Sequence, residues 1–76
     1  NSNLVIYPNP TSSQFTVTAA GTINRIEIRN MIGQVMYKGD VETSSTEIDA
    51  SEFEAGIYIV NIIIDGEVTT KQLFVQ

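Results

Sequence analysis

The sequence contains no cysteine and no histidine, and these two absences remove most routes to catalysis. Without cysteine the chain has no disulfide, no thiolate metal ligand and no thiol nucleophile. Without histidine it lacks the commonest general base, and no other nucleophile stands beside a base. The sequence therefore predicts a protein that acts through its surface, needs no cofactor and is not an enzyme.

Basic residues are also scarce. Four lysines and arginines stand against nine aspartates and glutamates, for a net charge of −5, and they are scattered at Arg25, Arg29, Lys38 and Lys71. Nucleic-acid binding requires clustered cations, so the charge pattern argues against a nucleic-acid partner. No apolar run approaches the roughly 20 residues of a membrane helix, so we expect no direct membrane insertion.

The chain does contain many short apolar runs. They are rich in Val, Ile, Thr, Tyr and Phe and are bounded by Gly, Pro, Asn, Asp or Ser, a pattern typical of strands. We expect seven strands, at Leu4–Tyr7, Phe15–Ala19, Ile23–Asn30, Gln34–Tyr37, Thr46–Asp49, Ile57–Ile64 and Val68–Val75. This spacing predicts one all-β domain, residues 1–76, with the fold of a small Ig-like antiparallel β-sandwich.

Two prolines, Pro8 and Pro10, follow the first expected strand. Proline cannot donate a hydrogen bond to a neighbouring strand, so this strand must end there or lie at an edge of the sheet. The second proline also favours an extended backbone at Asn9. The stretch Pro8-Asn9-Pro10 is therefore expected to form a rigid corner.

Three further connections carry turn residues. Asn30 to Gly33 follows an alternating strand and predicts a hairpin, while 51–56 is too short for a helix and is expected to form one turn that packs Phe53 against the core. Asp65-Gly66 stands between two β-rich runs, which is a strong hairpin signal.

The register of this last hairpin has two alternatives. A two-residue turn places Tyr58 opposite Leu73, whereas a three-residue turn places Phe74 there and reverses which side of the final strand faces inward. We favour the first, with Leu73 and Val75 inward and the methylene groups of Lys71 lying over the sheet edge.

Isoleucines occupy both faces of the strand expected at Ile57–Ile64. If its even-numbered residues face the core, the other face carries Ile57, Ile59 and Ile63, interrupted only by Asn61. Neighbouring side chains or loops would cover this face in a central strand. The alternative is an apolar patch for a partner, such as a preceding domain or a receptor.

Carboxylates are the remaining candidates for holding an ion. Asp49, Glu52 and Glu54 lie near one turn and Asp40 lies near Glu42, and their oxygens would suit a hard cation such as calcium. The spacing matches no calcium-binding loop, so solvated turn carboxylates are the favoured interpretation.

The aromatic residues include no tryptophan. Sugar-binding sandwiches present exposed planar aromatics, and here we expect most aromatic side chains in the core, with Tyr37 as the candidate for exposure. The six are Tyr7, Phe15, Tyr37, Phe53, Tyr58 and Phe74.

Three groups of residues occur in an order that resembles a known family. They are Tyr7-Pro8-Asn9-Pro10-Thr11 with Phe15-Thr16-Val17, then Ile26-Glu27-Ile28 to Gly33-Gln34-Val35, and finally Gly56-x-Tyr58-x-Val60-x-Ile62, Asp65-Gly66 and Lys71-Gln72-Leu73. Together they resemble the C-terminal sorting domain of type IX secretion cargo, in its Ig-like form. Ser13, Phe74 and Gln76 depart from the family's usual glycine, small aliphatic and basic residue.

The resemblance implies a non-catalytic role. Such domains direct a folded periplasmic cargo through the outer-membrane translocon, and a surface sortase-like protease then removes them while the cargo is anchored or released. Translocon and sortase components and a preceding cargo domain would be the partners, and the cell surface or medium the destination. The sequence starts at Asn1 without methionine, which fits a domain excised from a larger secreted precursor.

By the same resemblance, the last two strands would carry the signal. The residues expected at the translocon are Gly56, Tyr58, Val60, Asp65, Gly66, Lys71, Leu73 and Val75, while Pro8, Asn9, Pro10, Thr11, Phe15 and Gly33 would be structural. Lys71 is the choice for a charged contact. A final strand at a sheet edge would offer unpaired backbone groups to a partner strand, and would also allow two copies to dimerise.

A second interpretation gives the same fold another use, as an Ig-like spacer or a carbohydrate-binding accessory module of a secreted hydrolase. A spacer can lie between domains, whereas a sorting signal must lie at the C-terminus of its precursor. Glycan binding would require an exposed aromatic platform or an ordered cation.

Overall fold

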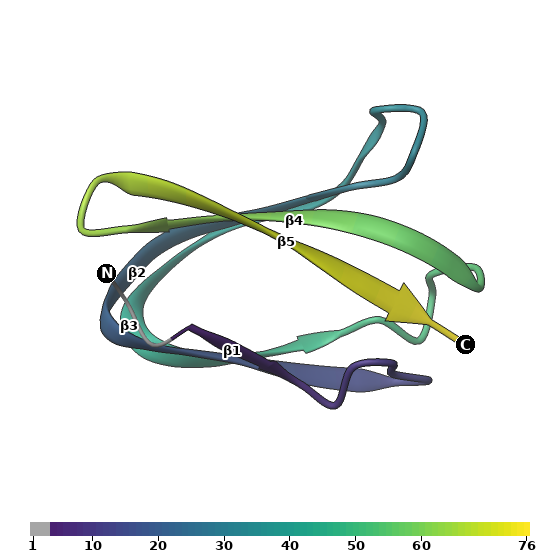
Figure 1. Ribbon diagram of the computed structural model, residues 1–76, viewed down its shortest axis with the longest axis horizontal. Coiled ribbons are helices and arrows are strands. Elements are labelled where there is room, and N and C mark those ends of the chain that lie inside the picture. Colours follow the sequence, from purple (N-terminus) through teal and green to yellow (C-terminus); the bar gives the residue numbers. More distant parts are fainter. Residues whose placement is uncertain (1–3) are drawn as a thin grey trace.

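A computed structural model of the chain describes residues 4–76 as a curled antiparallel β-sheet (Figure 1). Its strands are β1 (Val5–Tyr7), β2 (Gln14–Arg29), β3 (Val35–Asp49), β4 (Gly56–Ile64) and β5 (Glu67–Val75). Asn1, where the sequence begins, lies outside the described residues. Across residues 4–76 there is no helix, and so none long and apolar enough to cross a membrane.

The expected all-β antiparallel fold is confirmed, but the expected number of seven strands was wrong. Except for Asn30, β2 takes in the two strands expected at 15–19 and 23–30. Except for Gln34, β3 takes in those expected at 34–37 and 46–49. Gly21 and Gly39 interrupt the apolar pattern as turn residues would. The chain instead bends near them and keeps its ladder, with register shifts between β2 and β3 such as the one between Thr18 and Ile23.

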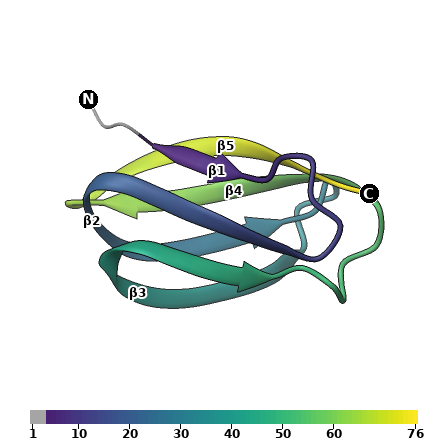
Figure 2. The same ribbon diagram turned by 90° about the horizontal axis from the view of Figure 1, so that it is seen from below.

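The central strand β2 pairs with β1, β3 and β4, and β4 pairs with β5. The first half of β2 lies between β1 and the end of β3, and its second half lies between β4 and the start of β3. Because β2 and β3 both bend, the sheet curls until its two halves face each other (Figure 1). β1 and β5 then lie along one side of the molecule, with β3 on the other side (Figure 2).

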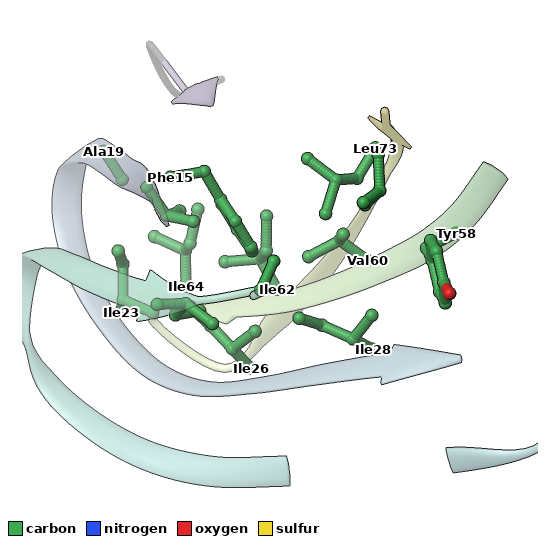
Figure 3. Close-up of a cluster of buried hydrophobic side chains, with 14 residues drawn as sticks. Phe15, Ala19, Ile23, Ile26, Ile28, Tyr58, Val60, Ile62, Ile64 and Leu73 are labelled. Carbon is green, nitrogen blue, oxygen red and sulfur yellow. The ribbon is translucent and has the colours of Figure 1, made fainter. Parts of the chain in front are cut away.

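The hydrophobic core lies between the two halves of the curled sheet (Figure 3). β2 buries alternate residues up to Ala19, and after a register shift between Ile23 and Arg25 it buries Ile26 and Ile28. The shift changes which positions face inward, so both halves of β2 contribute to one core. The buried hydrophobic residues are Phe15, Val17, Ala19, Ile23, Ile26, Ile28, Ile48, Ala50, Tyr58, Val60, Ile62, Ile64, Leu73 and Val75.

The β4–β5 hairpin has the favoured register. Tyr58 lies opposite Leu73, and Leu73 and Val75 are buried while Lys71 is exposed. The connection has two residues, Asp65 with φ of 50° and Gly66 with φ of 84°. Two positive φ values in a two-residue loop are the signature of a type I′ turn, which suits the twist of antiparallel strands.

Three other local expectations are also confirmed. The first strand ends at Tyr7, at an edge of the sheet. The hairpin after β2 is closed by Asn30, whose Oδ1 accepts hydrogen bonds from the backbone N–H groups of Ile32 at 3.1 Å and Gln34 at 2.9 Å. Phe53 packs against the core, with its ring centroid 5.1 Å from that of Tyr58.

The aromatic residues divide more evenly than expected. Phe15 and Tyr58 are buried and Phe53 is partly buried, whereas Tyr7, Tyr37 and Phe74 are 50%, 37% and 41% exposed. Tyr37 fits its expected place at a hairpin, where its hydroxyl lies close to Gly39. The expectation of a core position was wrong for Tyr7 and Phe74, because each lies on an edge strand with one face toward solvent.

Candidate recognition surface on the terminal hairpin

The residues expected at the translocon fall into two groups in the structure. Four side chains are in the core, with exposed fractions of 5% or less: Tyr58, Val60, Leu73 and Val75. The other four residues are exposed: Gly56, Asp65, Gly66 and Lys71. In the folded domain the first group supports the hairpin from inside. Only the second group is accessible to a partner.

The turn of this hairpin is fixed to the bend of β2. The backbone N–H of Asp65 donates to the carbonyl of Thr22 at 3.1 Å, and the N–H of Gly66 donates to Oδ1 of Asn24 at 3.0 Å. Gly21 permits this approach, because a Cβ atom there would meet the Asp65 carboxylate. One end of the hairpin is therefore held by residues more than 40 positions earlier in the chain.

The opposite end of the hairpin is held by the segment after β1. Asn9 Nδ2 donates to the Gln72 carbonyl at 3.0 Å, and Asn9 Oδ1 accepts from the Phe74 N–H at 3.0 Å. The Thr11 N–H donates to the Phe74 carbonyl at 2.8 Å, and the Gln76 N–H donates to the Thr11 carbonyl at 2.8 Å. Asn9 and Thr11 thus occupy the outer edge of β5 near its end, in the place of a neighbouring strand.

Thr11 is a buried polar residue that sequence reasoning placed only as structural. It is 2% exposed, and its hydroxyl donates to the Gln14 carbonyl at 2.8 Å and accepts from the Ser13 N–H at 3.3 Å. These bonds turn the chain from the proline segment into β2. The two X-Pro bonds of this segment, Tyr7-Pro8 and Asn9-Pro10, are cis.

Between these two attachments the outer edge of β5 is open. In a two-residue hairpin the residues flanking the turn form a hydrogen-bonded pair, here Ile64 and Glu67, so every second residue of β5 from Glu67 onward bonds to β4. The alternate residues Val68, Thr70, Gln72 and Phe74 direct their N–H and C=O groups outward, as the bonds of Asn9 and Thr11 to Gln72 and Phe74 show.

In the described part of the chain, five outward groups of β5 have no partner. Val68 and Thr70 each contribute an N–H and a C=O, and Gln72 contributes its N–H, because β4 is the one strand of residues 4–76 that pairs with β5 and the contacts from Asn9 and Thr11 begin at the Gln72 carbonyl. Sequence reasoning predicted an edge at the final strand. It did not predict that the end of this edge is already occupied.

Lys71 lies beside this open stretch as a cation without an ion pair in residues 4–76. The two arginines are paired, Arg25 with Asp40 at 3.6 Å and Arg29 with Glu27 at 3.3 Å. Lys38, on the other side of the molecule, is also exposed and outside any described ion pair. Among the described residues, Lys71 is thus the unpaired cation that a partner approaching the open stretch of β5 would meet.

The outer face of β4 is largely covered by its neighbours. Ile59 lies between Arg29 of β2 and Gln72 of β5, and it is partly buried, as is Ile63. This favours the interpretation of a central strand covered by adjacent side chains. Ile57 is the exception, 40% exposed, and lies opposite the exposed Phe74.

The carboxylates near the 51–56 turn do not converge. Within residues 4–76 no three acidic side chains come together in a group that could hold a metal ion. Asp49 Oδ1 instead accepts a hydrogen bond of 2.9 Å from the Ser51 N–H, and hydrogen bonds from the Ser51 backbone and side chain lower the pKa of Asp49 below its ordinary value of 3.8. Asp49 therefore serves to close the turn.

The family comparison covers all five strands. The family model of the secretion system C-terminal sorting domain matches residues 5–76, from the first residue of β1 to the last of the sequence. No curated protein sequence matches the chain. The family is one of non-catalytic signals that work with the type IX secretion machinery and mark a protein for export to the cell surface or the extracellular space. Because this match spans nearly the whole sequence and includes the entire β4–β5 hairpin, the chain belongs to the type IX secretion C-terminal sorting domains.

Proposed function

We propose that this domain directs a cargo protein, joined to it in a larger precursor, from the periplasm through the outer-membrane translocon. A surface sortase-like protease then removes the domain, and the cargo is anchored or released. The family match supports the role of a signal. The β4–β5 hairpin supports the proposed location of the recognition site. It is held at both ends, and between these ends it exposes Lys71 and the edge of β5.

The hairpin that carries this proposed signal is attached to the rest of the domain at both ends. The turn is held by Thr22 and Asn24, and the strand end by Asn9 and Thr11. These contacts keep the open stretch of β5 extended before a partner arrives, so binding does not have to order it. The buried side chains of the hairpin contribute by holding it on the core.

The test is a secretion assay. Residues 1–76 are fused to an exported reporter in a bacterium with a type IX system, and the reporter is measured in the medium and on the cell surface. We expect export that is abolished in a strain without the translocon. Export of the fusion from that strain would contradict the proposed role.

A charge-reversal variant tests whether the signal includes Lys71 without deleting any part of the domain. Lys71→Glu changes an exposed residue of β5, and Lys38→Glu changes an exposed lysine of β3 as a matched control. We expect Lys71→Glu to reduce export and Lys38→Glu to leave it unchanged. Equal export of both variants would place recognition away from this part of the hairpin. Mass spectrometry of the exported reporter shows whether the domain has been removed.

A further inference from the structure

The Asn9 side chain binds the edge of β5 in the way that the backbone of a neighbouring strand would. Its amide places one donor and one acceptor against Gln72 and Phe74, as the peptide groups of an adjacent strand would. The open stretch that precedes it, Val68 to Gln72, repeats the same outward pattern with five unpartnered groups in the described chain. Alternate residues of a strand are about 7 Å apart, and an extended backbone matches that spacing.

From this pattern we propose that the type IX machinery binds the domain by adding an extended segment of its own to β5, at Val68 to Gln72. This rests on the proposed function and specifies how the signal is read. The Asp65-Gly66 turn limits the segment at one end, and Asn9 limits it at the other. The added strand would pair over about five residues, which is the length of a typical short strand.

The other edges of the sheet are poorly suited to such an addition. β1 has three residues and is followed directly by Pro8. The free edge of β3 contains Glu42, whose φ of 63° breaks the regular extension of the strand. Short length, proline and irregular backbone are features that protect edges from strand addition. The open stretch of β5 has neither a proline nor a positive φ.

The side chains beside the open stretch indicate the chemistry of the added segment. Val68 is 63% exposed and lies on the outer face, while Lys71 lies on the opposite face of β5 and has no ion pair in residues 4–76. A complementary strand therefore carries an apolar residue beside Val68 and a carboxylate beside Lys71. These two residues lie on opposite faces of the added strand.

A proline substitution tests the backbone contact directly. Thr70→Pro removes an outward N–H and leaves the bonds of β5 to β4 intact, since these come from Thr69 and Lys71. Thr70→Val is the matched control, because it keeps the N–H and removes only the hydroxyl that donates to Asn61 Oδ1 at 2.8 Å. With folding verified by urea unfolding, we expect export of Thr70→Pro to fall about tenfold, as for the loss of a well-made hydrogen bond.

Normal export of a folded Thr70→Pro fusion would overturn strand addition while leaving the sorting role in place. If the wild-type fusion itself is not exported, the proposed function fails, and export can then no longer report on strand addition to β5. Amide exchange provides a second measurement that needs no variant. In the free domain the N–H groups of Val68, Thr70 and Gln72 should exchange fast and those of Thr69 and Lys71 slowly.

On adding detergent-solubilised type IX translocon, we expect exchange at Val68, Thr70 and Gln72 to slow by about tenfold or more, the scale of one new hydrogen bond. Exchange on the β3 edge should stay unchanged. Bound domain in which these three amides still exchange as in the free domain would overturn the proposal, whatever the export data show.

Discussion

Asn9 and Phe74 stand 65 residues apart in the sequence, yet the Oδ1 atom of Asn9 accepts a hydrogen bond of 3.0 Å from the backbone N–H of Phe74. The same amide donates to the carbonyl of Gln72. The proline-flanked opening motif and the closing strand are therefore one structural unit. A change in either alters the edge at which β5 ends.

Asn9→Ala should destabilise the domain by about 1–2 kcal/mol, since two hydrogen bonds are lost at an exposed edge where water replaces them in part. Urea unfolding measures this. Asn9→Asp keeps the acceptor for Phe74 but turns a carboxylate toward the Gln72 carbonyl, so it should also destabilise. A stability equal to wild type in both variants would mean that the contact contributes nothing.

Gly66→Ala should destabilise the terminal hairpin by about 1–2 kcal/mol, because Gly66 has a φ of 84° that an L side chain resists. No atom would contact the new Cβ within 4 Å, so the cost is conformational. Gly66→Asn is the control, since asparagine tolerates this backbone better and should lose less stability. Equal losses in the two variants would point to another cause.

Local sequence signals predicted the parts of the fold that local chemistry determines. Asp65-Gly66 predicted a two-residue turn. This turn fixes the register that buries Leu73 and Val75. Pro8 ended the first strand because it has no N–H. These signals act within a few residues, and a single sequence contains them.

The rest depends on contacts between distant residues. Gly21 reads as a turn residue, but β2 continues past it because β3 and β4 keep the ladder intact beyond the bend. The bonds from Asn9 to β5 join the two ends of the chain, and no local pattern indicates them. The strand count and the partly occupied edge were for this reason beyond sequence reasoning.

The carboxyl group of Asp49 should titrate below 3.8, because the Ser51 N–H and then the Ser51 hydroxyl stabilise its charged form and lower its pKa. A lowered folded pKa gives stability that is present at neutral pH. That stability starts to fall near the unfolded value and is lost as the pH drops through the folded pKa. NMR titration of the wild type and Ser51→Ala measures it: the variant should titrate higher but still below 3.8, since its backbone N–H remains. A wild-type midpoint at 3.8 would contradict the contact.

Gly21→Ala should destabilise the domain by about 1 kcal/mol, because its Cβ would meet the Asp65 carboxylate and approach the Ile64 side chain to 3.2 Å. The second mutation Asp65→Gly removes the first of these contacts and tolerates the φ of 50° at that position. In a double-mutant cycle we expect the cost of Gly21→Ala to shrink in the Asp65→Gly background. If the losses of stability in the two single variants simply add in the double variant, the Asp65 side chain does not contact the position of Gly21 in the way proposed.

Tyr58→Phe separates the two roles that its position allows, support of the fold and contact with the secretion machinery. The Tyr58 hydroxyl donates to the Glu54 carbonyl at 2.6 Å, while its ring is 5% exposed and packs on Phe53. Losing the hydroxyl should cost about 1 kcal/mol in urea unfolding. Tyr58→Ala should cost about 3–5 kcal/mol, because it leaves a cavity in the core.

If Tyr58 acts only through the fold, export of the reporter fusion should follow these stabilities, with Tyr58→Phe near wild type and Tyr58→Ala strongly reduced. A large loss of export in Tyr58→Phe at nearly unchanged stability would instead require the hydroxyl to reach the machinery. Since the hydroxyl is bonded to Glu54 inside the loop that precedes β4, that outcome would mean the loop opens during recognition.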